Sequence, residues 1–146
     1  MTDLRDLYQE TILDHNKHPR NFRRPAEASH HAHGHNPLCG DRVDIYLVIN
    51  DGRVVDAAFE GDGCAISTAS ASIMTELLQG RALDEVQALF EHFHDLLTSD
   101  AAPTSDLGKL EVLAGVRSFP TRVKCATLPW HTLQAALREQ ADATTE

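Results

Sequence analysis

A predicted β-hairpin bracketed by two cysteines constrains the fold of this chain more than any other feature. Over residues 43–49, Val, Ile and Leu recur at every second position, which is the period of a strand with one buried face. An Asp-Gly pair at 51–52 is a hairpin turn signal, and apolar residues resume over 54–59. A hairpin returns the chain to its starting point. Cys39 before it and Cys64 after it are therefore expected to lie close together.

Amphipathic patterns predict helices on both sides of this hairpin. The expected helices cover residues 3–15, 65–79, 83–97, a short stretch around 107–113 and most of 120–140. The polar segment 16–38 is predicted to be a connection that could include a short strand. These elements predict an α+β fold, in which a small antiparallel sheet of about three strands has helices packed on one face.

Length, charge and cysteine count narrow the class of protein. The 146 residues predict one domain, 1–146, with a core over about 3–140 and a disordered tail over 141–146. An odd cysteine count and the lack of a signal-like segment favour a reducing cytoplasm, where thiols stay free. The formal charge of −9 argues against nucleic acid or an anionic membrane as a partner.

Three cysteines and an aspartate supply the donors for one metal site. Cys39 and Asp41 lie in NPLCGD, Cys64 ends GDGC, and Cys125 ends RVKC. Three sulfurs and one oxygen are enough to hold a tetrahedral metal ion. Cys64 is expected at a helix start, where backbone N–H groups and the helix dipole should lower its pKa. Cys125 has to reach the other donors through tertiary packing.

Residues around Cys125 leave two questions open. Arg122 and Lys124 could offset the formal negative charge of three thiolates and a carboxylate on a divalent metal, or they could simply be solvated. Pro129 cannot donate a hydrogen bond to the carbonyl of Cys125. Either the last helix kinks there, or Cys125 lies in a turn and the helix restarts with Pro129 in its first turn.

Four histidines precede Cys39 in the polar connection: His30, His31, His33 and His35. Imidazoles on a flexible segment could bind a second metal ion. The simpler interpretation is a solvated loop with adventitious binding or none. Trp130 is expected either at a partner surface or buried against the last helix.

Four segments occur in the order and with the residues of a known family. They are LY…ILDH…PRN at 7–21, NPLCGD at 36–41, FEGDGCAIS…ASAS at 59–72 and FPTRVKCATL at 119–128. Over about residues 5–137 the chain resembles the SufU branch of the IscU/NifU N-terminal domain family of iron–sulfur assembly proteins. The resemblance implies zinc as the metal, with Cys39, Asp41, Cys64 and Cys125 as its ligands.

Two departures from the IscU pattern favour the SufU branch. Lys124 stands where IscU-type scaffolds have a histidine, and residues 90–108 resemble the insertion of SufU-like proteins. The resemblance implies a sulfurtransferase-like partner of a SufS-type cysteine desulfurase rather than an independent enzyme. Cys39 would accept the persulfide sulfur and pass it to downstream iron–sulfur scaffold proteins.

Two alternatives remain beside this hypothesis. A scaffold could assemble a labile [2Fe–2S] cluster, with iron in place of zinc, on the same ligands. A structural-zinc or regulatory binding module would carry out no sulfur chemistry at all.

Overall fold

The computed structural model describes residues 4–38, 40–99, 102, 104–140 and 142–144. Its centre is the predicted hairpin, in which β2 (Asp41–Asn50) pairs with the antiparallel β3 (Arg53–Asp62). Asp51 and Gly52 form the turn, and both have positive φ angles, of 52° and 73°. Asp-Gly suits such a turn because both residues tolerate this conformation better than most.

Two further strands complete a four-stranded sheet in the order β3-β2-β1-β4. Strand β1 (His30–Asn36) is antiparallel to β2, and the short β4 (Asp142–Thr144) is parallel to β1. The expected antiparallel core of three strands is confirmed. The strand that the sequence allowed within the polar connection is the seven-residue β1. One expectation needs correction, since residues 142–144 of the predicted disordered tail form β4 and pair with β1.

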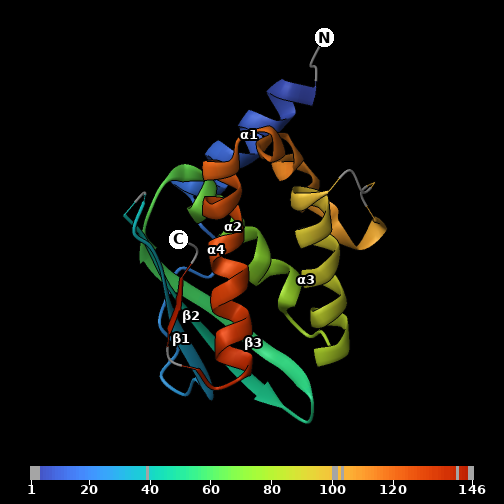
Figure 1. Ribbon diagram of the computed structural model, residues 1–146. Helices are drawn as coiled ribbons and strands as arrows, with labels where there is room; N and C mark the ends of the chain where they lie inside the picture. Colours follow the sequence, from blue (N-terminus) through green and yellow to red (C-terminus); the bar gives the residue numbers. More distant parts are fainter. Residues whose placement is uncertain (1–3, 39, 100–101, 103, 141, 145–146) are drawn as a thin grey trace.

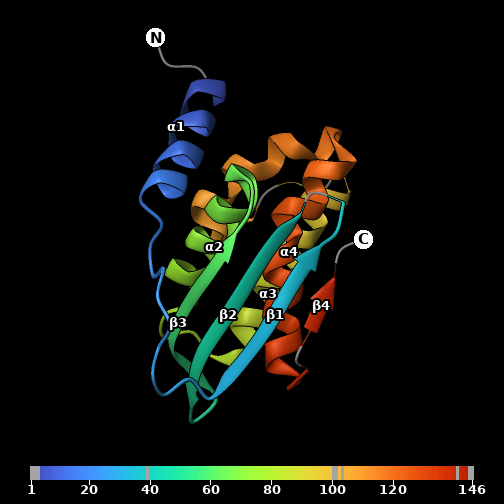
Figure 2. The same ribbon diagram turned by 90° about the vertical axis from the view of Figure 1, so that its left-hand side faces the viewer.

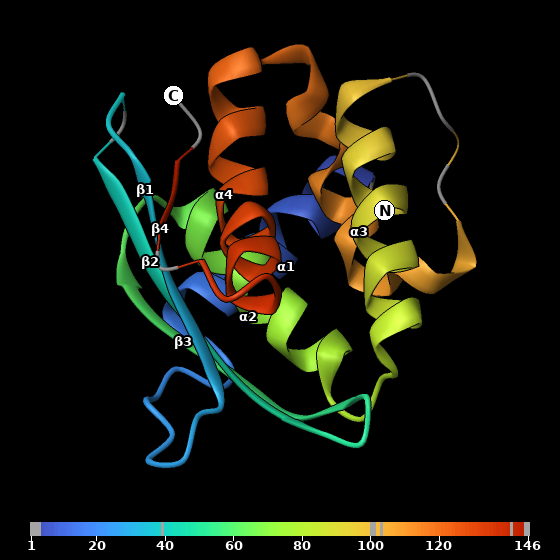
Figure 3. The ribbon, with the colours of Figure 1, turned by 60° about the horizontal axis from the view of Figure 1, so that its bottom comes forward.

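Five helical elements pack around this sheet. They are α1 (Leu4–Lys17), α2 (Ala65–Leu78), α3 (Leu83–Thr98), the 3₁₀ segment η1 (Ser105–Ser118) and α4 (Pro120–Leu137). Helix α4 lies across β1 and β2, α2 lies against β3, and α3 with η1 forms an outer layer (Figure 1, Figure 3). In the described part of the chain no helix covers the other face of the sheet (Figure 2). Within the same ranges, no helix is long and apolar enough to cross a membrane.

Close packing sets the position of α4, which carries Cys125. A Cβ atom on Gly34 of β1 would lie 1.9 Å from Thr132 Oγ1, so only glycine lets the helix approach this strand. Trp130 is buried, and its Nε1–H donates to Ser70 Oγ of α2 over 3.2 Å. The prediction that Trp130 is buried is confirmed, although it lies in the last helix itself and packs against α2 and α3. The alternative that placed it at a partner surface is wrong.

Helix α4 runs through Pro129 without interruption. It begins at Pro120, where the missing N–H costs nothing, and it includes Cys125. The hypothesis that Cys125 lies in a turn before a restarted helix is wrong. Segment η1 is interrupted at Gly108, whose φ of 52° and ψ of −127° are not helical. Its buried residues recur every third position, the period of a 3₁₀ helix: Leu107, Leu110, Leu113 and Val116.

Candidate metal centre

Three of the four predicted ligands converge at one end of the sheet. The donor atoms of Asp41, Cys64 and Cys125 all lie within 4.8 Å of one another. Asp41 begins β2, Cys64 precedes α2, and Cys125 lies in the second turn of α4. Cys39, the fourth predicted ligand, lies outside the described residues. In sequence it belongs to the short connection between Asn36 and Asp41, which pair with each other across β1 and β2.

Cys64 is the N-cap of α2, as the sequence predicts. Its extended backbone, with φ −70° and ψ 168°, ends the approach from β3, and its Sγ accepts a hydrogen bond of 3.4 Å from the Ser67 backbone N–H. A side chain in this position satisfies one of the free N–H groups at a helix start. The cap holds the half-buried sulfur in a defined place.

Asp41 is buried, and both oxygens of its carboxylate contact Cys64. Its Oδ1 accepts the Cys64 backbone N–H over 2.9 Å, and its Oδ2 lies 3.6 Å from Cys64 Sγ. Gly63 makes room for this contact, since a Cβ there would lie 3.1 Å from Oδ1. In the sequence Gly63 stands out only as the residue before Cys64 in GDGC, and its steric role becomes visible only in the fold.

The electrostatics of Cys64 differ from the expectation. Burial raises the pKa of its thiol and the nearby Asp41 carboxylate raises it further, while hydrogen bonds from Ser67 and Cys125 lower it. Burial and the negative charge of Asp41 thus raise the pKa of Cys64 more than the hydrogen bonds at the helix start lower it. Without a bound metal ion, the prediction of a lowered pKa is wrong.

The donor set fits a divalent transition metal. Two thiols and a carboxylate within 4.8 Å would repel one another if all were ionised, and Cys125 is buried with them. A bound divalent cation reverses this balance, because its charge is the largest in the site and it deprotonates a coordinating thiol. Zinc and iron–sulfur clusters are the usual occupants of sulfur-rich sites.

The predicted supporting charges lie on α4 beside this site. Arg122 is exposed and Lys124 is half-buried. Their helical positions place both near Cys125, and their role in offsetting ligand charge stays a prediction. The four histidines lie on β1 and contribute no donor to the group formed by Asp41, Cys64 and Cys125.

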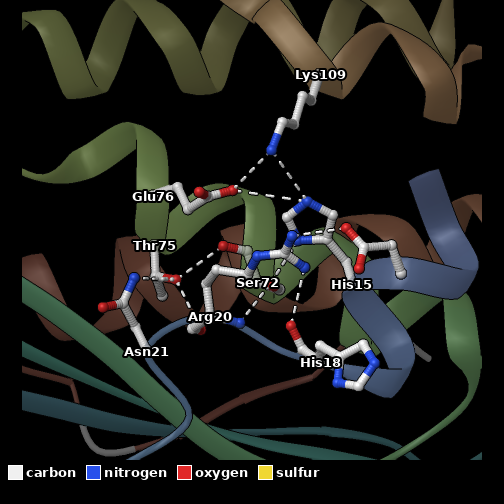
Figure 4. Close-up of polar contacts among 9 residues, drawn as sticks. His15, His18, Arg20, Asn21, Ser72, Thr75, Glu76 and Lys109 are labelled. Atoms are coloured by element: carbon white, nitrogen blue, oxygen red, sulfur yellow. Dashed lines mark hydrogen bonds and ion pairs between the residues drawn. The ribbon is translucent and has the colours of Figure 1, made fainter.

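A buried polar cluster that sequence analysis missed fastens α1 to α2 (Figure 4). His15 is fully buried, and its Nδ1 lies 2.7 Å from Ser72 Oγ. Its Nε2 lies 3.4 Å from the Lys109 ammonium and 3.6 Å from a Glu76 oxygen. Burial lowers the pKa of His15, and the charges of Arg20 and Lys109 lower it further. The sequence does contain a sign that His15 is buried, because position 15 falls on the same apolar face of the predicted helix as Ile12.

Comparison with known proteins places this architecture in a family. The family model for the NifU-like N-terminal domain matches residues 7–126. The chain belongs to that family. The resemblance seen in the sequence is thereby confirmed, and the protein is a member of the SufU/IscU group of iron–sulfur cluster assembly proteins.

Relatives of both branches match nearly the whole chain. The zinc-dependent sulfurtransferase SufU of Bacillus subtilis is 39% identical, over 94% of this chain and 94% of the relative. The iron–sulfur cluster assembly scaffold protein IscU of Streptococcus pyogenes is 35% identical, over 98% of this chain and 90% of the relative. A crystal structure of a putative scaffold protein for the SUF system from Fervidobacterium islandicum superposes with a TM-score of 0.83 at 33% identity, covering 88% of this chain and 94% of that one.

Proposed function

We propose that this protein is a zinc-dependent sulfur acceptor for a SufS-type cysteine desulfurase. Zinc would be held by Cys39, Asp41, Cys64 and Cys125. The observation that carries the proposal is the convergence of three of these donors, from Asp41, Cys64 and Cys125, within 4.8 Å. Cys39 is only two residues before Asp41 in the chain. The zinc-dependent sulfurtransferase at 39% identity over 94% of both chains supports the choice of metal and activity.

Bound zinc would keep the cysteines as thiolates without redox chemistry. Cys39 is proposed as the carrier because the other two sulfurs are held by helices, Cys64 as a cap and Cys125 inside α4. The neighbours of Cys39 differ, since Leu38 is exposed and Gly40 has a φ of 74° that few other residues adopt. A partner cysteine carrying a persulfide could therefore reach Cys39 most directly.

The transfer itself is a thiol–persulfide exchange that needs no external oxidant or reductant. The Cys39 thiolate attacks the terminal sulfur of the desulfurase persulfide, and a new sulfur–sulfur bond forms on Cys39. The old sulfur–sulfur bond breaks, and the desulfurase cysteine leaves as a thiolate. A downstream iron–sulfur scaffold protein would then take the sulfur from Cys39 by the same exchange.

A second candidate is a scaffold that assembles a [2Fe–2S] cluster on the same residues. The IscU relative at 35% identity over 98% of this chain favours it. An oxygen ligand such as Asp41 beside three sulfurs would suit a cluster that has to be released.

Intact-mass analysis with peptide mapping tests the proposal. The zinc-loaded protein is incubated with a SufS-type desulfurase and cysteine, with Cys39→Ser as the matched variant. We expect a mass gain of one sulfur atom on Cys39 and faster alanine release, and neither in the variant. No gain in the wild-type protein, together with a [2Fe–2S] absorption spectrum after supply of iron and sulfide, would establish the second candidate instead.

A further inference from the structure

Strand β1 carries four histidines and belongs to a sheet with one face that no described helix covers (Figure 2). Along β1 the even-numbered residues Ala32, Gly34 and Asn36 are buried towards α4. Side chains alternate between faces along a strand, so His31, His33 and His35 share the opposite face. In a flexible loop, which was the simpler interpretation of the sequence, these side chains would have had no fixed relation to one another.

Carboxylates flank one of these histidines on both sides. His33 is paired with Asp44 in β2 and with Asp142 in β4, and Asp44 is paired in turn with Glu60 in β3. Directly paired residues project from the same face of a sheet. One imidazole thus lies in a row with three carboxylates across all four strands, a setting that attracts a cation.

Asp44 already binds two of the imidazoles. Its Oδ1 lies 3.0 Å from His31 Nε2 and 3.2 Å from His33 Nδ1. The His31 ring stacks on Tyr46, with centroids 4.6 Å apart and planes 8° from parallel. Tyr46 is held in turn by its hydroxyl, which donates to Glu60 Oε1 over 3.1 Å. One nitrogen of His31 and one of His33 therefore point at the same oxygen of Asp44, and stacking on Tyr46 fixes the orientation of the His31 ring.

We propose that His31, His33 and Asp44 form a second metal site, for a divalent transition-metal cation such as Ni²⁺, Zn²⁺ or Cu²⁺. Imidazole and carboxylate together suit these ions. The two histidines are separated by two residues of strand, about 6.6 Å. Their side chains are 46% and 40% exposed, so the two ring nitrogens that contact Asp44 can bind an ion beside its carboxylate without disturbing the core.

His35, the third histidine on this face, has a neighbour of the opposite charge and is not part of the proposed site. His35 is paired with Arg42, whose guanidinium repels a cation, whereas His33 is paired with Asp44. The proposed site is also separate from the cysteine centre. Asp41 is buried on the helix-covered face of β2, while Asp44 lies three residues along on the open face, about 10 Å away.

Nickel titration of the zinc-loaded, full-length protein tests this inference, with zinc bound at the cysteine centre and zinc release monitored throughout. Amide NMR signals of β1 and β2 around His33 should broaden at low Ni²⁺, and calorimetry should show one added equivalent without loss of zinc. His31→Ala and His33→Ala should each weaken Ni²⁺ binding at least about tenfold, and His35→Ala less than about twofold.

The amide spectra also show that each variant is folded. Equal losses in His33→Ala and His35→Ala would overturn the site, because they would indicate nonspecific binding along the strand. In protein loaded with a single equivalent of zinc, nickel uptake that occurs only with loss of that zinc from the cysteine centre would also overturn it. Because the readout is Ni²⁺ binding, the result does not depend on the proposed sulfur transfer.

Discussion

The backbone N–H of Cys64 donates a hydrogen bond of 2.9 Å to Asp41 Oδ1, so one predicted metal ligand holds the backbone of another. The contact joins the beginning of β2 to the cap of α2, the two ends of the hairpin. If Asp41 also binds the metal, as we propose, small changes around its carboxylate should affect both the Cys64 backbone and metal binding.

Replacing Asp41 should weaken metal binding and destabilise the fold together. Asp41→Ala removes the carboxylate proposed as a metal ligand and leaves the partly buried Cys64 N–H without its acceptor, at a cost of about 1–3 kcal/mol in the free energy of unfolding. Zinc affinity, measured by chelator competition, should fall at least about tenfold. The matched control is Asp62→Asn on the exposed end of β3, which should change neither quantity. Unchanged zinc affinity in Asp41→Ala would exclude Asp41 as a ligand.

Adding one methyl group at position 63 should act through Asp41. The Cβ of Gly63→Ala would lie 3.1 Å from Asp41 Oδ1, closer than ordinary van der Waals contact, so the carboxylate has to shift. We expect reduced zinc affinity with little change in stability. In an Asp41→Ala background the same substitution should have almost no further effect on affinity, because residues in contact show coupled effects. Additive losses in the double variant would contradict this mechanism.

Removing the hydroxyl of Ser70 should loosen α4 against α2. Ser70 Oγ donates to the Ala126 carbonyl over 2.6 Å and accepts from Trp130 Nε1, and both contacts are buried. Ser70→Ala leaves the buried Trp130 indole N–H without its acceptor and removes the hydroxyl that donates to the Ala126 carbonyl, so thermal or denaturant unfolding should show a loss of about 1–3 kcal/mol. Because Ala126 follows Cys125, zinc affinity should fall as well. Trp130→Phe combined with Ser70→Ala should cost less than the sum of the single changes; strict additivity would argue against the shared contact.

Stability should depend on pH through His15. Burial lowers its pKa below the ordinary value of 6.5, so the unfolded chain binds the proton more readily than the folded one. Stability therefore rises with pH below about 6.5 and is lost as pH falls through that range. Between about pH 7.5 and about pH 5.5, the wild-type protein should lose more unfolding free energy than His15→Gln does. The exposed His18→Gln is the control and should follow the wild type; an unchanged pH dependence in His15→Gln would refute the assignment.

Local sequence determined the parts of this fold that depend on neighbouring residues. The two-residue period and the Asp-Gly turn predicted the β2–β3 hairpin, and the turn residues before Cys64 predicted the start of α2. The hairpin alone explains why Asp41 and Cys64 meet. The family motifs indicated which cysteines and which aspartate to consider as ligands.

Tertiary structure decided whatever depends on burial or on contacts between distant segments. Cys125 reaches the site only because α4 packs on β1 at Gly34 and on α2 through Trp130. The pKa of Cys64 is raised rather than lowered, because burial and Asp41 outweigh the helix start. Strand β1 forms despite its polar composition because β2 and β4 pair with it on both sides. Periodicity reports the local backbone, whereas burial and distant charges depend on how the whole chain is packed.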